Sequence, residues 1–73
     1  MVRVHSIMGF TYYYRCTKDG RIQKSDDGKK WKVAKNWQGK RVNMAATSIA
    51  EVEAKIARKM DNGDYNFGAE VIN

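Results

Sequence analysis

Turn signals recur every eight to eleven residues through the middle of this chain, and they favour short antiparallel strands over longer elements. Asp19-Gly20 and Asp27-Gly28 are Asp-Gly pairs, in which glycine adopts a positive φ at no steric cost. Gln38-Gly39 is a third candidate turn. Three hairpins imply four strands, which we place at about residues 10–17, 21–25, 29–37 and 40–46.

The third hairpin has the best-defined register, because a two-residue loop at Gln38-Gly39 pairs Trp37 with Lys40. Side-chain alternation then predicts a core face made of Trp31, Val33, Val42, Met44 and Ala46. The opposite face would carry Lys30, Lys32, Ala34, Asn36, Arg41 and Asn43. For the first hairpin we expect a longer loop or a bulge that buries Tyr12, Tyr14 and Cys16 and turns Tyr13 and Arg15 outward.

The hydrophobic period changes after the third hairpin. Ser48 and Glu51 form a capping-box pattern, and Asn62-Gly63 supplies a stop signal. Between them an apolar stripe with helical spacing is formed by Ile49, Val52, Ile56 and Met60. We therefore expect a helix over about residues 48–61, packed across one face of the strands. Residues 2–7 alternate weakly and predict an edge strand, and residues 64–73 could add a short one.

Length and cysteine content limit how the fold is held together. The chain has 73 residues, which suits one domain, 1–73, with its core in 10–62. One Cys and one His supply neither an internal disulfide nor the four ligands of a structural zinc site, so we expect no metal and no cofactor. No apolar run of membrane-spanning length and no signal peptide is readable, which favours a cytoplasmic protein without a membrane partner.

The positive charge is concentrated in one segment. Ten of the fourteen basic residues lie between Arg15 and Arg41 with only three acids, a formal charge of +7, whereas the rest of the chain sums to −1. A basic face on a small sheet is typical of proteins that bind a polyanion, most often nucleic acid. The alternative is a lysine-rich surface that only keeps a small domain soluble.

Catalytic patterns are weak. His5 has no neighbouring acid, Cys16 lies in an aromatic strand where a thiol behaves as a small apolar side chain, and Asp26-Asp27 precedes a glycine as turns do. We therefore expect no enzymatic activity.

Lys and Arg bind phosphates, and Arg, Asn and Gln can also read base edges in the major groove. Trp37 could stack on a base or pack at the edge of the core. The candidate nucleic-acid-binding residues are Arg15, Arg21, Gln23, Lys30, Lys32, Asn36, Trp37, Arg41 and Asn43.

Three segments, GKKWKV at 28–33, GKRVNM at 39–44 and ATSIAEVEA at 46–54, resemble the plant ethylene-response-factor DNA-binding domain and the arm-binding domain of tyrosine recombinases. The resemblance covers about residues 13–60. It implies three antiparallel strands on one C-terminal helix, with the sheet lying in the major groove. By position it implies the base and phosphate contacts Arg21, Gln23, Lys30, Lys32, Asn36, Arg41 and Asn43.

Together these patterns predict an α+β fold: an antiparallel meander of three to four strands on one C-terminal helix, with a further terminal strand. They favour a regulator or recombination accessory that binds double-stranded DNA through the exposed sheet face, with the nucleoid as its location. Two alternatives stay open. One is RNA or single-strand binding, with Tyr13 and Trp37 stacking on bases. The other is a phage-type or mobile-element-type inhibitor or adaptor that binds an acidic protein surface, and the oligomeric state is open in each case.

Overall fold

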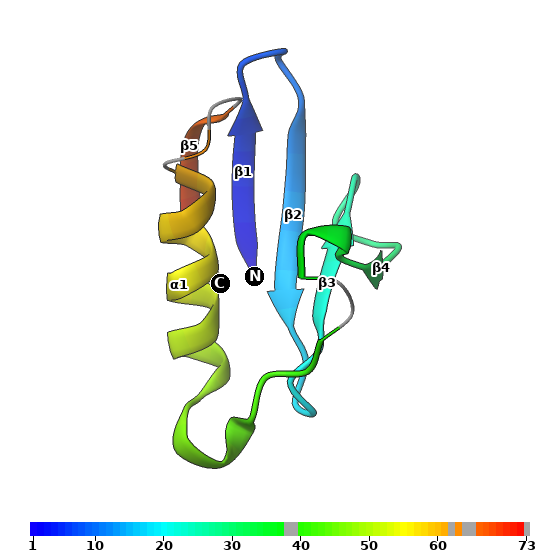
Figure 1. The fold of residues 1–73 in the computed structure, drawn as a ribbon. Coiled ribbons are helices and arrows are strands. Elements are labelled where there is room, and N and C mark those ends of the chain that lie inside the picture. Colours follow the sequence, from blue (N-terminus) through cyan, green and yellow to red (C-terminus); the bar gives the residue numbers. More distant parts are fainter. Residues whose placement is uncertain (38–39, 62, 64–65, 73) are drawn as a thin grey trace.

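A five-stranded antiparallel sheet with the strand order β4-β3-β2-β1-β5 forms the frame of the protein (Figure 1). The computed structural model describes residues 1–37, 40–61, 63 and 66–72. The strands are β1 (Val2–Ser6), β2 (Thr11–Cys16), β3 (Ile22–Ser25), β4 (Lys32–Val33) and β5 (Asn66–Val71), and the helix is α1 (Ile49–Asp61). The predicted α+β class, a meander packed on a C-terminal helix, is confirmed.

The core lies between the sheet and α1. From the sheet it takes Val2, Val4, Tyr14, Cys16 and Ile22, all at most 5% exposed. From α1 it takes Val52, Ile56, Ala57 and Met60. The predicted apolar stripe therefore does face the sheet, and Tyr14 and Cys16 do point inward while Tyr13 and Arg15 point to the other face.

The expected edge strand at residues 2–7 is instead an interior strand. β1 pairs with β2 on one side and with β5 on the other. Val2 and Val4 alternate onto the face beneath α1 and are fully buried there, which explains why so short an apolar pattern occupies the middle of the sheet.

The helix begins near its predicted signal. The Ser48 hydroxyl accepts a hydrogen bond from the Glu51 amide at 3.2 Å, so half of the capping box forms. The Glu51 carboxylate accepts from the Thr47 hydroxyl at 2.9 Å. At the other end the Gly63 amide donates to the Met60 carbonyl at 3.2 Å.

The predicted third hairpin is wrong. β4 contains only Lys32–Val33, residues Lys35–Trp37 form a 3-10 turn, and Met44–Ala46 form another in place of a strand. Val33 is 52% exposed and does not belong to the core, so the expected core face is only partly formed. Val42 and Met44 are half-buried and do pack against the core. Trp31 packs on Arg15 instead, and Ala46 is exposed. The expected turn at Gln38-Gly39 lies outside the described residues.

Tertiary contacts explain this outcome. Gly20 has a φ of +86°, and a Cβ at this position would stand 2.1 Å from the Val42 carbonyl oxygen. The bare glycine lets the segment around Val42 lie against the β2–β3 turn, where the Val42 amide donates to the Gly20 carbonyl at 2.8 Å. The Asn43 side chain accepts from the Ala45 amide and caps the turn that follows. These bonds replace the ladder that a hairpin would have formed.

The two faces of the sheet are covered unequally. α1 lies over the β1 and β5 side, and the chain between β4 and α1 returns on the same side, because Trp37 packs on the inward-facing Tyr14 (Figure 1). Within the described residues, no helix covers the opposite face. None of the described helices is long and apolar enough to cross a membrane.

Candidate nucleic-acid interface

The uncovered face of β2 and β3 carries a cluster of Arg15, Gln23 and Trp31. Arg15 and Gln23 are cross-strand partners, and the Arg15 Nε donates to the Gln23 Oε1 at 2.7 Å. The Arg15 guanidinium also lies 4.2 Å from the centre of the Trp31 ring. Cation–π contact and hydrogen bond together hold the guanidinium in one place on this face.

The loop after β3 borders this cluster. Its amides of Lys29 and Lys30 donate to one carboxylate oxygen of Asp27 at 2.8 and 3.0 Å, and the Gly28 amide donates to the buried Ser25 hydroxyl at 2.8 Å. The bonds from the Lys30 and Lys29 amides, and one from Ser25, lower the pKa of Asp27 to about 2.

The same loop folds back over the uncovered face. Gly28 has a φ of +77°, and a Cβ at this position would lie 3.7 Å from the ring of Tyr13. The loop therefore rests on Tyr13, and its exposed Lys29 and Lys30 directly precede Trp31, with Lys30 and Trp31 lining one hollow. We call these six residues the Arg15 face: Tyr13, Arg15, Gln23, Lys29, Lys30 and Trp31.

The other half of the uncovered face is close to neutral. The Glu70 carboxylate lies 2.8 Å from the Arg3 guanidinium and 3.2 Å from the His5 ring. These hydrogen bonds, that of Arg3 first, hold the pKa of Glu70 below its ordinary value. The excess positive charge on this side of the sheet therefore lies toward β3 and β4.

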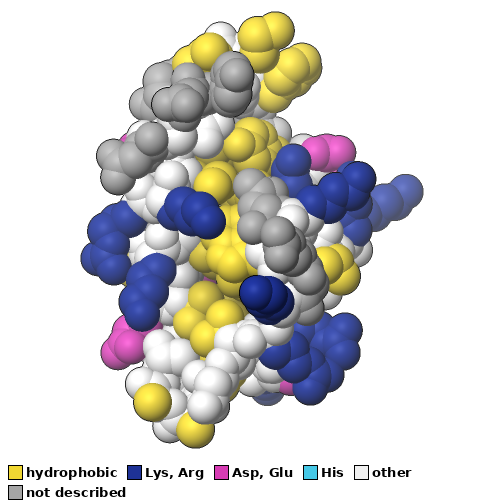
Figure 2. Space-filling view, in the orientation of Figure 1, with side chains coloured by type: hydrophobic (Ala, Val, Ile, Leu, Met, Phe, Trp, Pro, Cys, Tyr) yellow, Lys and Arg dark blue, Asp and Glu magenta, His cyan; other side chains and the backbone are white. Residues whose placement is uncertain are grey.

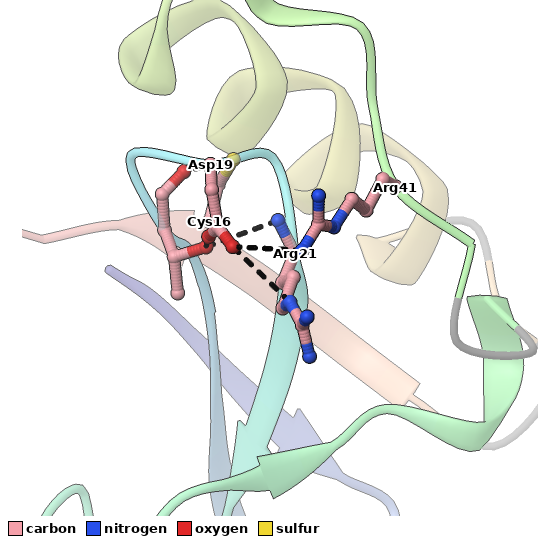
Figure 3. A network of polar contacts seen from close by, with 5 residues as sticks. Cys16, Asp19, Arg21 and Arg41 are labelled. Carbon is pink, nitrogen blue, oxygen red and sulfur yellow. Dashed lines mark hydrogen bonds and ion pairs between the residues drawn. The ribbon is translucent and has the colours of Figure 1, made fainter.

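Two of the predicted binding residues share one acid at the opposite end of β3. The Asp19 carboxylate forms ion pairs with both Arg21, at 3.1 Å, and Arg41, at 3.6 Å (Figure 3). The pKa of Asp19 is lowered, chiefly by a hydrogen bond from the Thr17 hydroxyl and further by the two guanidinium groups. Asp19 therefore offsets part of the positive charge of Arg21 and Arg41, and these two residues do not belong to the Arg15 face.

The remaining predicted residues are spread around the molecule. Lys32 pairs with Lys24, whose ammonium lies over the Tyr12 ring on the α1 side of the sheet. Trp37 is also on that side, edge-on to Tyr14 with 5.2 Å between the ring centres, so it packs at the edge of the core. Asn43 is occupied as a turn cap. The side chain of Asn36 lies outside the described part of the structure.

Of the nine predicted residues, Arg15 and Gln23 are therefore in direct contact, and Lys30 lines a hollow with Trp31, which packs on Arg15. Sequence reasoning missed Trp31, which it assigned to the core, and Lys29. The sequence Ser25-Asp26-Asp27-Gly28 contained the signal for this placement. Ser25 and Asp27 accept hydrogen bonds from the amides of a wide loop, and after this loop Trp31 lies opposite the end of β3 on the uncovered face.

The thiol of Cys16 is buried in the core beneath α1. It is 5% exposed, and burial first, then the Glu53 and Asp19 carboxylates, raise its pKa. The carboxylate of Glu53 is itself buried, where it accepts from the Cys16 amide at 3.1 Å and lies 2.5 Å from the amino group of Met1. Among the described residues no group of three or more His, Cys, Asp or Glu side chains is placed to hold a metal ion.

Fold and surface define the class of the protein: a small α+β domain in which one helix covers a five-stranded antiparallel sheet and leaves a partly basic face open. Comparisons with protein-family models, with curated proteins and with solved structures found no match.

Proposed function

We propose that this chain binds nucleic acid, with double-stranded DNA as its ligand, through the Arg15 face. The observation that carries the proposal is the guanidinium of Arg15, held by Trp31 and Gln23 on a sheet face that no described helix covers. An arginine fixed in this way presents its donors to phosphate or to a guanine edge with little loss of side-chain entropy.

The charge distribution supports the same ligand. Lys29 and Lys30 extend from a loop whose amides are already bonded to Asp27, so the backbone is fixed while both ammonium groups stay in solvent. Phosphate contacts of this kind provide most of the affinity of non-specific binding, and they orient a protein on the duplex.

A two-stranded ribbon fits the major groove, as β-ribbon DNA-binding proteins use it. β2 and β3 are neighbouring antiparallel strands of the five-stranded sheet, and Gln23 points from their uncovered face. The Gln23 Oε1 accepts from Arg15, so the amide NH2 of Gln23 is the group that can donate to an acceptor on a base edge. The functional role would be that of a regulator or recombination accessory, located in the cytoplasm with the nucleoid.

RNA or single-stranded DNA is the second candidate, and the aromatic rings favour it. Trp31 and Tyr13 lie on the same face as Arg15, and each is half-buried. A ring with one side in solvent can stack on an unpaired base, which is worth about 1–3 kcal/mol per base.

Trp31 fluorescence separates the two candidates. In a Trp37→Phe variant the emission reports Trp31 alone, and it is followed while duplex DNA, the same single strand and the matching RNA are titrated at low salt. The proposal predicts the tightest binding to duplex, with modest quenching. Strong quenching and tighter binding by a single strand would move the assignment to the second candidate, and no binding by any of the three would contradict both.

A further inference from the structure

A groove on the α1 side of the sheet has no part in the proposed nucleic-acid interface. It has a volume of about 280 Å³ and lies between α1 and the segment that returns from β4. The residues lining it are Ile22, Trp37, Val42, Thr47, Val52, Lys55, Ile56 and Lys59. In Figure 2 the apolar side chains form a band down this face, with Lys and Arg on both sides.

The floor and walls of the groove are apolar. Ile22, Val52 and Ile56 are buried core residues, each at most 6% exposed, and they form the bottom. Trp37 and Val42 are half-buried and form the wall opposite α1. The groove is therefore an opening in the core and can take a further apolar side chain without disturbing a polar network.

The rim is positively charged. Lys55 and Lys59 stand one turn apart on α1, and the Lys59 ammonium lies 4.9 Å from the centre of the Trp37 ring. Among the described residues that line the groove, none is acidic. The Lys59 ammonium therefore lies next to the apolar wall, so a ligand that contacts Trp37 also contacts the positive charge of Lys59.

The size of the groove limits what it can hold. Pockets for cofactors and drug-sized ligands usually measure about 300–1,000 Å³. This groove is slightly smaller and open to solvent, which suits one or two side chains of a peptide rather than a whole small molecule.

We infer that the groove between α1 and the wall formed by Trp37 and Val42 binds an acidic amphipathic segment of a protein partner. Large apolar side chains of this segment insert beside Trp37, and its carboxylates pair with Lys55 and Lys59. Charge complementarity selects this occupant. The segment takes the helix-in-groove form of recognition, in which apolar residues at helical spacing enter an apolar groove.

A second copy of the chain fits less well. The most exposed apolar residues that it offers are Ile7, Met8 and Phe10 at the β1–β2 tip, which are 54%, 73% and 67% exposed. This tip carries no acidic side chain to meet the two lysines. A nucleic acid would meet the lysines but would gain nothing from an apolar floor.

Trp37 emission tests the inference. A Trp31→Phe variant is titrated with short synthetic peptides in which Leu and Phe recur at helical spacing among Glu residues. The control peptides have Ser in place of Leu and Phe. We expect a blue shift of Trp37 emission and dissociation constants of about 10–100 μM for the amphipathic peptides. The Ser peptides should bind at least about tenfold more weakly.

Matched variants separate this site from the nucleic-acid interface. Lys55→Gln with Lys59→Gln should weaken peptide binding about tenfold and leave duplex binding unchanged, whereas Lys29→Gln with Lys30→Gln should do the reverse. Circular dichroism checks that both pairs fold. Three results would overturn the inference: no shift with any amphipathic peptide, equal binding of the Ser peptides, or a shift produced by raising the protein concentration alone.

Discussion

The guanidinium of Arg15 lies 4.2 Å from the centre of the Trp31 ring, on the side of the sheet opposite α1. The two residues come from different elements, β2 and the segment before β4, so their contact fixes how the loop after β3 meets the sheet. The Nε of Arg15 also donates a hydrogen bond to the Oε1 of Gln23, so the guanidinium is oriented before any ligand binds.

Arg15→Lys tests whether this orientation matters. The variant keeps the charge but loses the planar group that lies over Trp31 and bonds to Gln23. We expect it to lose about 1–3 kcal/mol of binding free energy on a preferred duplex and much less on random duplex, measured by fluorescence anisotropy. An equal loss on both duplexes would mean that Arg15 acts only as a charge.

Core truncation tests the packing of α1. Val52→Ala and Ile56→Ala each remove buried methyl groups beneath the sheet, and each should lower the free energy of unfolding by about 2–4 kcal/mol in urea denaturation. Lys55→Ala lies on the same helix but is exposed, so it should change stability by less than about 0.5 kcal/mol. If all three variants unfold at the same urea concentration, α1 does not pack as described.

Two glycines with the same φ form a matched pair. Gly9 and Gly20 both have a φ of +86°, but a Cβ at Gly9 meets nothing within 4 Å, whereas one at Gly20 meets the Val42 carbonyl. Gly9→Ala should cost about 1–2 kcal/mol for the left-handed backbone alone. Gly20→Ala should cost about 1–3 kcal/mol more because the segment at Val42 must move away. Equal costs in denaturation experiments would show that this segment does not rest on Gly20.

The loop that presents Lys29 and Lys30 should respond to acid in a defined range. The pKa of Asp27 is about 2 in the folded chain, below its ordinary value of 3.8. A lowered folded-state pKa means that Asp27 stabilises the loop fully above about pH 4 and loses this effect as the pH falls through about 2. The amide NMR shifts of Lys29 and Lys30 should titrate with a midpoint near pH 2.

Asp27→Asn provides the control for this titration, since it removes the titrating carboxylate while an amide oxygen can still accept hydrogen bonds. The low-pH transition at Lys29 and Lys30 should then disappear. A wild-type midpoint close to 3.8 would contradict the hydrogen bonds from these two amides.

Local patterns predicted the parts of this fold that depend on local chemistry. Ser48 and the apolar stripe marked α1, and the two Asp-Gly pairs marked turns in which Gly20 and Gly28 have positive φ. The same residues supported the α+β class. Such signals work because capping and turn geometry involve neighbours in sequence.

The prediction of the third hairpin was wrong because the contacts that replace it join residues far apart in the sequence. Nothing near Val42 indicates that its carbonyl will lie against Gly20, and nothing near Trp37 indicates its edge-on contact with Tyr14. Without the hairpin, the basic face predicted for Lys30, Lys32, Asn36, Arg41 and Asn43 does not form. Of the nine candidate residues, only Arg15, Gln23 and Lys30 belong to the Arg15 face. Trp31 belongs to the same face because the loop held by Ser25 and Asp27 determines which residues after β3 point to the uncovered side of the sheet.

The salt dependence of duplex binding tests the central claim most directly. If the three cations of the Arg15 face each neutralise about one phosphate, the logarithm of the association constant should fall with the logarithm of salt concentration at a slope of about −3. Substituting Gln for Arg15, Lys29 and Lys30 together should reduce the magnitude of this slope by about 2–3, whereas Lys55→Gln with Lys59→Gln should leave it unchanged. Equal slopes for the two variants, or no duplex binding at low salt, would contradict the assignment of nucleic-acid binding to the Arg15 face.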